Sequence, residues 1–303
     1  MTTFTILLVL TALAVLIAAA VGGLVFALAA PLLGTVIALI FGVSVLGTLI
    51  SSALFCYEES TRTGKPAMPL LNLCLRAAPL GILSQAAMFC LYPLGLWPGL
   101  WSRPTSGKDL VVMVHGLFHN AGAWALFRHR LHSKGYATAC FSYSSWGTEL
   151  EEVVRDLQEY LRDLAARNPG RNIHLVGHSL GGLLLRAALG SMETPENVRS
   201  VVTLGAPFGG SKLSPFAFQS LGRYLQYDGE TVRRLAALPH PGHVRSLALY
   251  SPVDGLVLPS DALHCSAPGW VEKETAPVSH VSMLYAESVF EDAKRWMREV
   301  SGN

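Results

Sequence analysis

The chain has 303 residues, of which 51% are hydrophobic and only 15% are charged, and its formal net charge is +2. This balance, with no basic stripe, excludes a nucleic-acid-binding surface. The five cysteines include no C-x-x-C pair and do not indicate a disulfide framework, and the ten histidines lack the spacing of a metal site. We therefore expect no metal and no other cofactor.

The first part of the chain is an uncharged apolar run. Residues 1–57 contain no Asp, Glu, Lys, Arg or His. A membrane-spanning helix needs roughly 20 apolar residues, so the run is long enough for two, which Pro31 and Gly34 divide into 4–29 and 33–56. The start lacks the positive charge of a signal peptide, and the run exceeds the length of a signal-peptide core. We expect an uncleaved transmembrane helical hairpin.

Residues 58–108 comprise a polar turn, a second apolar segment and a linker. The apolar segment, 68–101, is broken by prolines, which favours helices that lie in the membrane interface, and a third span over 77–100 is the alternative. In the interfacial case, the positive-inside rule places the domain formed by residues 109–303 on the cytoplasmic face of a bacterial cytoplasmic membrane, and a third span would reverse this. The basic residues behind this orientation are Arg62, Lys65 and Arg76.

Residues 109–303 alternate between short apolar runs and helical segments. This alternation predicts a mostly parallel sheet covered by helices on both faces. The expected strands are 110–115, 136–143, 172–176, 198–204, 244–250 and 269–273, and the expected helices are 120–134, 148–167, 180–191 and 282–299. An aromatic insert at 206–242 fits neither pattern, and we expect it to cap the site. The side chains expected to form an acyl-binding wall are Phe118, Phe208, Phe216 and Phe218.

One motif points directly to chemistry. The run 177–182, Gly-His-Ser-Leu-Gly-Gly, follows a strand-like stretch and opens a helix-like one. Strand, G-x-S-x-G and helix together are typical of a nucleophile elbow, in which a sharp turn exposes a serine hydroxyl above a sheet. We therefore expect Ser179 to be a catalytic nucleophile.

A serine nucleophile needs a base, and the base needs an orienting acid. Asp254 follows the strand-like run 244–250, so we expect it to be the acid. His280 precedes the last helix and follows the last strand, so we expect it to be the base. The alternatives are Asp261 and Asp228 for the acid and His264 for the base.

Acyl transfer also needs two N–H donors directed at the oxyanion. The backbone N–H of Leu180, next to the nucleophile, is one candidate. The loop after the first strand, His115-Gly116-Leu117, offers the second, and we expect it to be the N–H of Leu117, with His115 holding the loop.

Five motifs together resemble bacterial lipases and esterases of the α/β-hydrolase superfamily. They are 114–117, 177–182, 203–211, 254–257 and 280–284. The resemblance covers about 109–300 and implies an α/β-hydrolase fold and hydrolysis of carboxylic esters, including lipid esters, through an acyl-enzyme. Two departures are visible: Phe208 stands where these lipases often have histidine, and apolar segments replace the usual first two strands.

Three functions are compatible with these features. The first is a membrane-anchored lipase or esterase, or a phospholipase, that acts on acyl lipids of the bilayer. The second is an acyltransferase or thioesterase with the same triad, because the pocket decides which acceptor reacts. The third, a non-catalytic membrane scaffold, is disfavoured because nucleophile, acid, base and oxyanion loop are all present.

Overall fold

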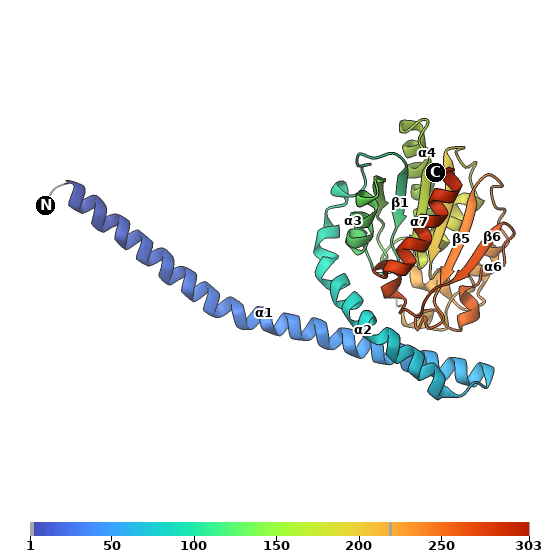
Figure 1. Cartoon of the computed structure of the whole chain (residues 1–303), viewed down its shortest axis with the longest axis horizontal. Helices are drawn as coiled ribbons and strands as arrows, with labels where there is room; N and C mark the ends of the chain where they lie inside the picture. Colours follow the sequence, from blue (N-terminus) through green and yellow to red (C-terminus); the bar gives the residue numbers. More distant parts are fainter. Residues whose placement is uncertain (1–2, 218–219, 303) are drawn as a thin grey trace. The chain divides into compact units, whose positions relative to one another are not determined.

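The computed structural model describes residues 3–217 and 220–302, and side chains from residue 30 onward. The chain comprises two units, Met1–Val45 and Leu46–Asn303. Helix α1 (Thr3–Thr63) begins in the first unit and ends in the second (Figure 1). In the first unit, the apolar side chains from residue 32 to 43 are mostly exposed.

The predicted turn near Pro31 is wrong, because α1 is continuous through this residue. A proline inside a helix removes one backbone hydrogen bond. The neighbouring alanine and leucine residues favour helix, and Thr35 Oγ1 donates to the Pro31 carbonyl at 2.9 Å. The chain reverses instead after Thr63, where three residues precede helix α2 (Ala67–Leu91). Thus α1 and α2, and not two halves of residues 1–57, form the helical pair.

The second unit is built on a six-stranded sheet with strand order β2-β1-β3-β4-β5-β6. Every neighbouring pair is parallel. All six predicted strands are therefore confirmed. Their bounds are β1 Leu110–Val114, β2 Ala137–Phe141, β3 Ile173–His178, β4 Val198–Leu204, β5 Arg245–Tyr250 and β6 Trp270–Glu274.

Helices cover both faces of this sheet, as the alternation predicted. Along β1, Val112 packs in a core with α4 and α5, whereas Val111 and Met113 pack on the other face with α3 and α7. Figure 1 shows α7 lying across one face. The helix bounds are α3 Ala125–Ser133, α4 Leu150–Arg167, α5 Leu180–Gly190, α6 Glu230–Ala236 and α7 Glu287–Ser301.

Short 3-10 helices replace parts of the predicted helices and fill the loops. One precedes α3 and another precedes α7, so both α-helices begin later than predicted. Two more lie in the insert 206–242, together with α6. The bounds of the 3-10 helices are η1 Tyr92–Leu96, η2 Pro98–Leu100, η3 Ala121–Trp124, η4 Ser214–Phe216, η5 Leu221–Leu225, η6 Ser260–Leu263 and η7 Val281–Leu284.

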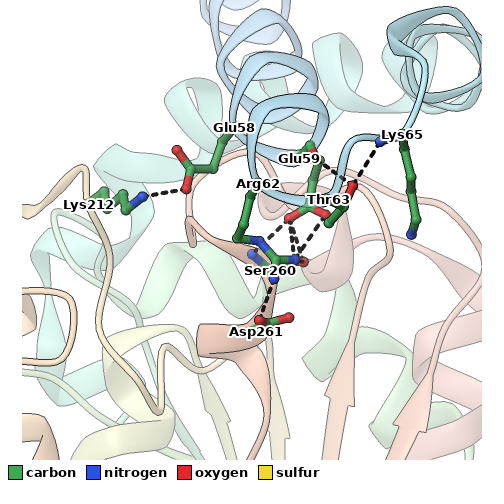
Figure 2. A network of polar contacts seen from close by, with 8 residues as sticks. All are labelled: Glu58, Glu59, Arg62, Thr63, Lys65, Lys212, Ser260 and Asp261. Carbon is green, nitrogen blue, oxygen red and sulfur yellow. Dashed lines mark hydrogen bonds and ion pairs between the residues drawn. The ribbon is translucent and has the colours of Figure 1, made fainter.

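The C-terminal turns of α1 are attached to the loop that follows β5 (Figure 2). Glu59, whose side chain is 6% exposed, accepts hydrogen bonds from the Ser260 hydroxyl at 2.6 Å and the Ser260 N–H at 3.3 Å. Arg62 pairs with Asp261 at 2.5 Å. Because the buried carboxylate is fully paired, this end of α1 is a fixed part of the second unit. The contacts in Figure 2 also involve Glu58, Thr63, Lys65 and Lys212.

Strand order also predicts where a site would form. Within the sheet, β2 and β3 lie on opposite sides of β1, so the chain moves towards one edge after β1 and towards the other edge after β2. In open α/β sheets, ligands bind at the carboxyl ends of the strands where the order reverses. The loops after β1 and β3 therefore meet at the expected position of a site.

Candidate active site

Ser179 lies on a sharp turn between β3 and α5. Its backbone has φ 52° and ψ −125°, and α5 begins at the next residue. A positive φ is costly for a serine and persists only where the surroundings impose it. A Cβ at Gly181 would lie 2.2 Å from the Val114 carbonyl oxygen, and one at Gly177 would lie 2.6 Å from the Gly182 nitrogen. The glycines thus let strand and helix approach closely enough to form the elbow.

Asp254 and His280 form a buried pair. His280 Nδ1 lies 2.6 Å from Asp254 Oδ2, and the residues are 5% and 0% exposed. The other carboxylate oxygen accepts the backbone N–H groups of Leu256 at 2.9 Å and Val257 at 3.0 Å. A carboxylate held in this way orients the imidazole with Nδ1–H directed at Asp254, which leaves Nε2 free to accept a proton.

Ser179 and His280 line one cavity of about 570 Å³. Most of its lining is apolar, with side chains from the loop after β1, from the insert and from the loop after β5. None of the described lining residues is Asp, Glu, Lys or Arg. The apolar lining residues from these loops are Leu117, Phe118, Pro207, Leu213, Phe216, Ala217, Leu225, Leu256 and Val257.

The loop after β1 is held in place by His115. Its Nδ1 lies 2.9 Å from the Gly116 carbonyl oxygen, and its Nε2 accepts the Tyr143 N–H at 3.3 Å. The Tyr143 hydroxyl donates to the His115 carbonyl at 2.9 Å, and the two rings stack. The next residues, Leu117 and Phe118, line the cavity. This bonding keeps the backbone of Leu117 beside the elbow.

Two histidines that the sequence did not assign to the catalytic site also line the cavity. The rings of His119 and His178 stack at 5.5 Å, and His178 Nε2 donates to the His280 carbonyl at 3.0 Å. Burial lowers the pKa of His119 to about 3 and that of His115 to about 4, and it places the pKa of His178 well below its usual range. The site therefore surrounds His280 with neutral rings. The sequence signal that could have identified His178 is its position inside G-x-S-x-G, directly before the nucleophile.

These buried histidines predict acid sensitivity. Their folded-state pKa values are lowered from an unfolded value near 6.5, so the unfolded chain binds protons first as the pH falls. Stability is therefore present above about pH 6.5 and is lost towards pH 4, at about 1–2 kcal/mol per pH unit for each histidine. Urea denaturation between pH 7.5 and 4.5 measures this. His119→Gln should reduce the slope of the free energy of unfolding against pH by the contribution of one proton, whereas His129→Gln, at an exposed position, should leave the slope unchanged. Equal slopes in the two variants would contradict the assignment.

The proposed acyl-wall phenylalanines lie in different places. Phe118 and Phe216 line the cavity. Phe208 does not belong to this wall: it is 9% exposed and packs edge-on against Trp270 at 5.3 Å, in a core below the insert. Phe208 N–H bonds back to the Ala206 carbonyl in a tight turn, and the side chain belongs to the core shared with α4 and α5. Phe218 lies outside the described residues.

The alternative acids and base are engaged elsewhere. Asp261 pairs with Arg62 and Asp228 pairs with Arg233, both at 2.5 Å. His264 Nδ1 lies 3.0 Å from Glu272. None of the three belongs to the lining of the cavity at Ser179. The geometry therefore favours Asp254 and His280.

A second Ser-His-Asp arrangement lies at the amino ends of the strands. His174 Nδ1 is 2.7 Å from Ser200 Oγ, and its Nε2 is 3.6 Å from Asp109 Oδ2 and 3.1 Å from Ser301 Oγ. Ser200 and His174 are both 0% exposed. A substrate cannot reach a serine without solvent access, so we interpret this set as buried polar groups that satisfy one another.

Comparison with known proteins agrees with this architecture. A sequence model of the alpha/beta hydrolase family matches residues 111–299. The chain is 38% identical over 106 residues to "Probable esterase PIR7A" of Oryza sativa subsp. indica, which covers 33% of this chain and 40% of that protein. It is 31% identical over 107 residues to methylesterase 3 of Arabidopsis thaliana, which covers 33% and 41% respectively. The chain thus spans about two fifths of the length of these curated relatives.

The fold also resembles a solved structure. Bacillus licheniformis lipase BlEst2 superposes with a TM-score of 0.50 at 19% identity, covering 66% of this chain and 95% of the lipase. At this identity the likeness concerns the fold alone.

Proposed function

Because the chain belongs to the alpha/beta hydrolase family, we propose that it is a carboxylic ester hydrolase that acts through Ser179, His280 and Asp254. The observation that carries the proposal is the buried 2.6 Å pair of His280 and Asp254, which shares one cavity with a serine on a strained elbow. Nucleophile, base and orienting acid are what acyl transfer requires.

The proposed reaction has two halves. Ser179 Oγ attacks the ester carbonyl while His280 Nε2 takes its proton, and the backbone N–H groups of Leu117 and Leu180 stabilise the oxyanion. His280 then gives the proton to the departing alcohol, which leaves an acyl-enzyme. Water then attacks the acyl carbonyl while His280 Nε2 removes its proton. The bond between the acyl carbon and Ser179 Oγ breaks as His280 returns the proton to that oxygen, and the acid is released. Asp254 stabilises the imidazolium in both halves.

The substrate proposed is an ester with an apolar acyl group, as in a lipid. A largely apolar cavity without a permanently charged lining residue favours burial of hydrocarbon over binding of a charged group. Phe118 and Phe216 would contribute to the acyl wall. The experiment that tests the function is hydrolysis by the full-length purified protein across p-nitrophenyl esters, triacylglycerols and phospholipids. If the protein hydrolysed none of these esters, the proposed function would be wrong. Transfer of the acyl group to an added alcohol in place of water would indicate an acyltransferase instead.

We further propose that α1 anchors the protein in a membrane. Two helical stretches have the length and composition of membrane spans, Ala30–Thr63 and Ala67–Leu96. In the second unit, however, α2 packs against the catalytic loops, since a Cβ at Gly81 would lie 3.3 Å from Ser279 Oγ. We therefore propose one span within residues 3–45, no span in α2, and a catalytic domain on the cytoplasmic side with Arg62 and Lys65.

Membrane association is testable on the full chain. The protein should remain in the pellet after carbonate washing and leave it only with detergent, because an apolar span stays in the bilayer. In spheroplasts of a bacterial expression host, external protease should remove an N-terminal epitope but spare the catalytic domain. Digestion of the catalytic domain from outside would contradict this topology, and release by carbonate would contradict the anchor.

A further inference from the structure

One face of α1 belongs to the cavity that contains Ser179. Gly47, Ile50, Ser51 and Leu54 all line it, and α2 contributes Gln85. Spacings of three, four and seven residues place side chains on a single face of a helix. The helical pair therefore supplies part of the wall of the cavity that contains Ser179 and residues of the insert. The apolar composition of residues 1–57 did not indicate this role.

This wall is fixed to the loops that hold the acid and the base. A Cβ at Gly255, next to Asp254, would lie 2.6 Å from the Ser51 carbonyl oxygen. The loop of His280 contacts α2 at Gly81, as described above. Glu59 and Arg62 hold the end of α1 about 14 and about 18 Å further along the helix from Ile50. Figure 2 shows how these side chains converge on the Ser260 loop.

The side chains that α1 contributes to the cavity favour an apolar ligand. Ile50 and Leu54 are apolar and remain 50% and 38% exposed, although they line the cavity. The histidines of the lining, His119 and His178, are neutral near pH 7 because burial lowers their pKa values. Covering exposed apolar surface with hydrocarbon is favourable because it removes that surface from water. A long acyl chain would cover these side chains, whereas an acetyl group at Ser179 would not need them.

We propose that Ile50 and Leu54 of α1 are specificity-determining residues that bind the hydrocarbon of a long-chain acyl ester. This rests on the proposed function and extends it: α1 contributes to the substrate site as well as anchoring the protein in a membrane. Gly47 leaves room for the Gln85 side chain of α2, and Ser51 and Gly255 let α1 approach the loop of Asp254, while Ile50 and Leu54 contact the hydrocarbon.

The test compares Ile50→Trp with Leu49→Trp in the full-length, detergent-solubilised protein. Leu49 precedes Ile50 on the same helix and is 53% exposed, but it does not line the cavity. We expect Ile50→Trp to lower the ratio of kcat/KM for hexadecanoyl over acetyl p-nitrophenyl ester about 10-fold or more, because the ring occupies space for several methylenes. Leu49→Trp should keep the wild-type ratio, and Leu54→Ala should lower it by removing contact. An unchanged ratio in Ile50→Trp, or equal losses in Ile50→Trp and Leu49→Trp, would overturn the proposal.

A binding measurement separates this inference from the proposed reaction. The fluorescent fatty acid cis-parinaric acid should bind the Ser179→Ala protein, and the added Ile50→Trp change should weaken that binding about 10-fold, whereas Leu49→Trp should not. If no ester were hydrolysed but this pattern held, the catalytic proposal would fail while the acyl site stood. If acetyl ester were hydrolysed but Ile50→Trp bound the fatty acid like its control, the acyl site would fail alone.

Discussion

Ser179→Ala should yield a folded protein whose ester hydrolysis falls at least about 10⁴-fold, because the attacking oxygen is lost while the cavity and its donors remain. Alanine tolerates the φ of 52° no worse than serine, so the elbow should persist. Initial rates on an acetyl ester, with thermal unfolding as the check on folding, measure the effect. Labelling by a small fluorophosphonate should disappear in the same variant.

The matched control is Ser200→Ala. Ser200 lies in the second Ser-His-Asp arrangement and is fully buried beside His174. This change should lower stability, since it leaves a buried imidazole nitrogen without its partner, but the folded protein should still be labelled. Labelling that persists in Ser179→Ala and vanishes in Ser200→Ala would show that the nucleophile is wrongly assigned.

His280→Ala should reduce turnover nearly as much as Ser179→Ala, and Asp254→Asn should reduce it by about 10⁴-fold. The neutral amide can donate its own N–H to Nδ1, which favours the wrong imidazole tautomer, and it carries no negative charge to stabilise the imidazolium. Double variants with Ser179→Ala should be no worse than Ser179→Ala alone, since the three groups act as one unit.

Two variants at the alternative positions serve as controls for these changes. His264→Ala removes a partner of Glu272, and Asp261→Asn removes a partner of Arg62. Both groups are partly or largely exposed and their ion pairs contribute little, so turnover should stay within a few-fold of wild type. An inactive His264→Ala beside an active His280→Ala would reverse the assignment of the base.

Local patterns were sufficient wherever one short segment determines the geometry. The G-x-S-x-G run predicts the elbow because the approach of β3 to α5 depends on Gly177, and that of α5 to the end of β1 depends on Gly181. Strands of the sheet were also predictable, since buried parallel strands are continuous apolar runs. The positions of Asp254 and His280 followed from chain order relative to those strands.

Patterns failed where distant segments compete for the same space. Phe208 and Phe216 are both aromatic residues of one insert, yet only Phe216 faces the cavity, because a turn after β4 directs Phe208 towards Trp270. The sequence predicted a turn near Pro31 because proline disfavours a helix locally. The preference of the surrounding alanine and leucine residues outweighs that cost.

The sequence by itself determined the order of strands and helices, the elbow at Ser179, and an acid and a base after later strands, because these depend on local backbone preferences and on chain order. Only the tertiary structure decided that Asp254 pairs with His280 in place of their rivals, and that the face of α1 at Ile50 and Leu54 completes the cavity. The Asp254–His280 pair joins two loops 26 residues apart. The contacts of α1 join segments about two hundred residues apart, such as Ser51 and Gly255, and depend on how closely two backbones can approach. Hydrophobicity alone does not distinguish an apolar helix that faces lipid from one that also lines a substrate site.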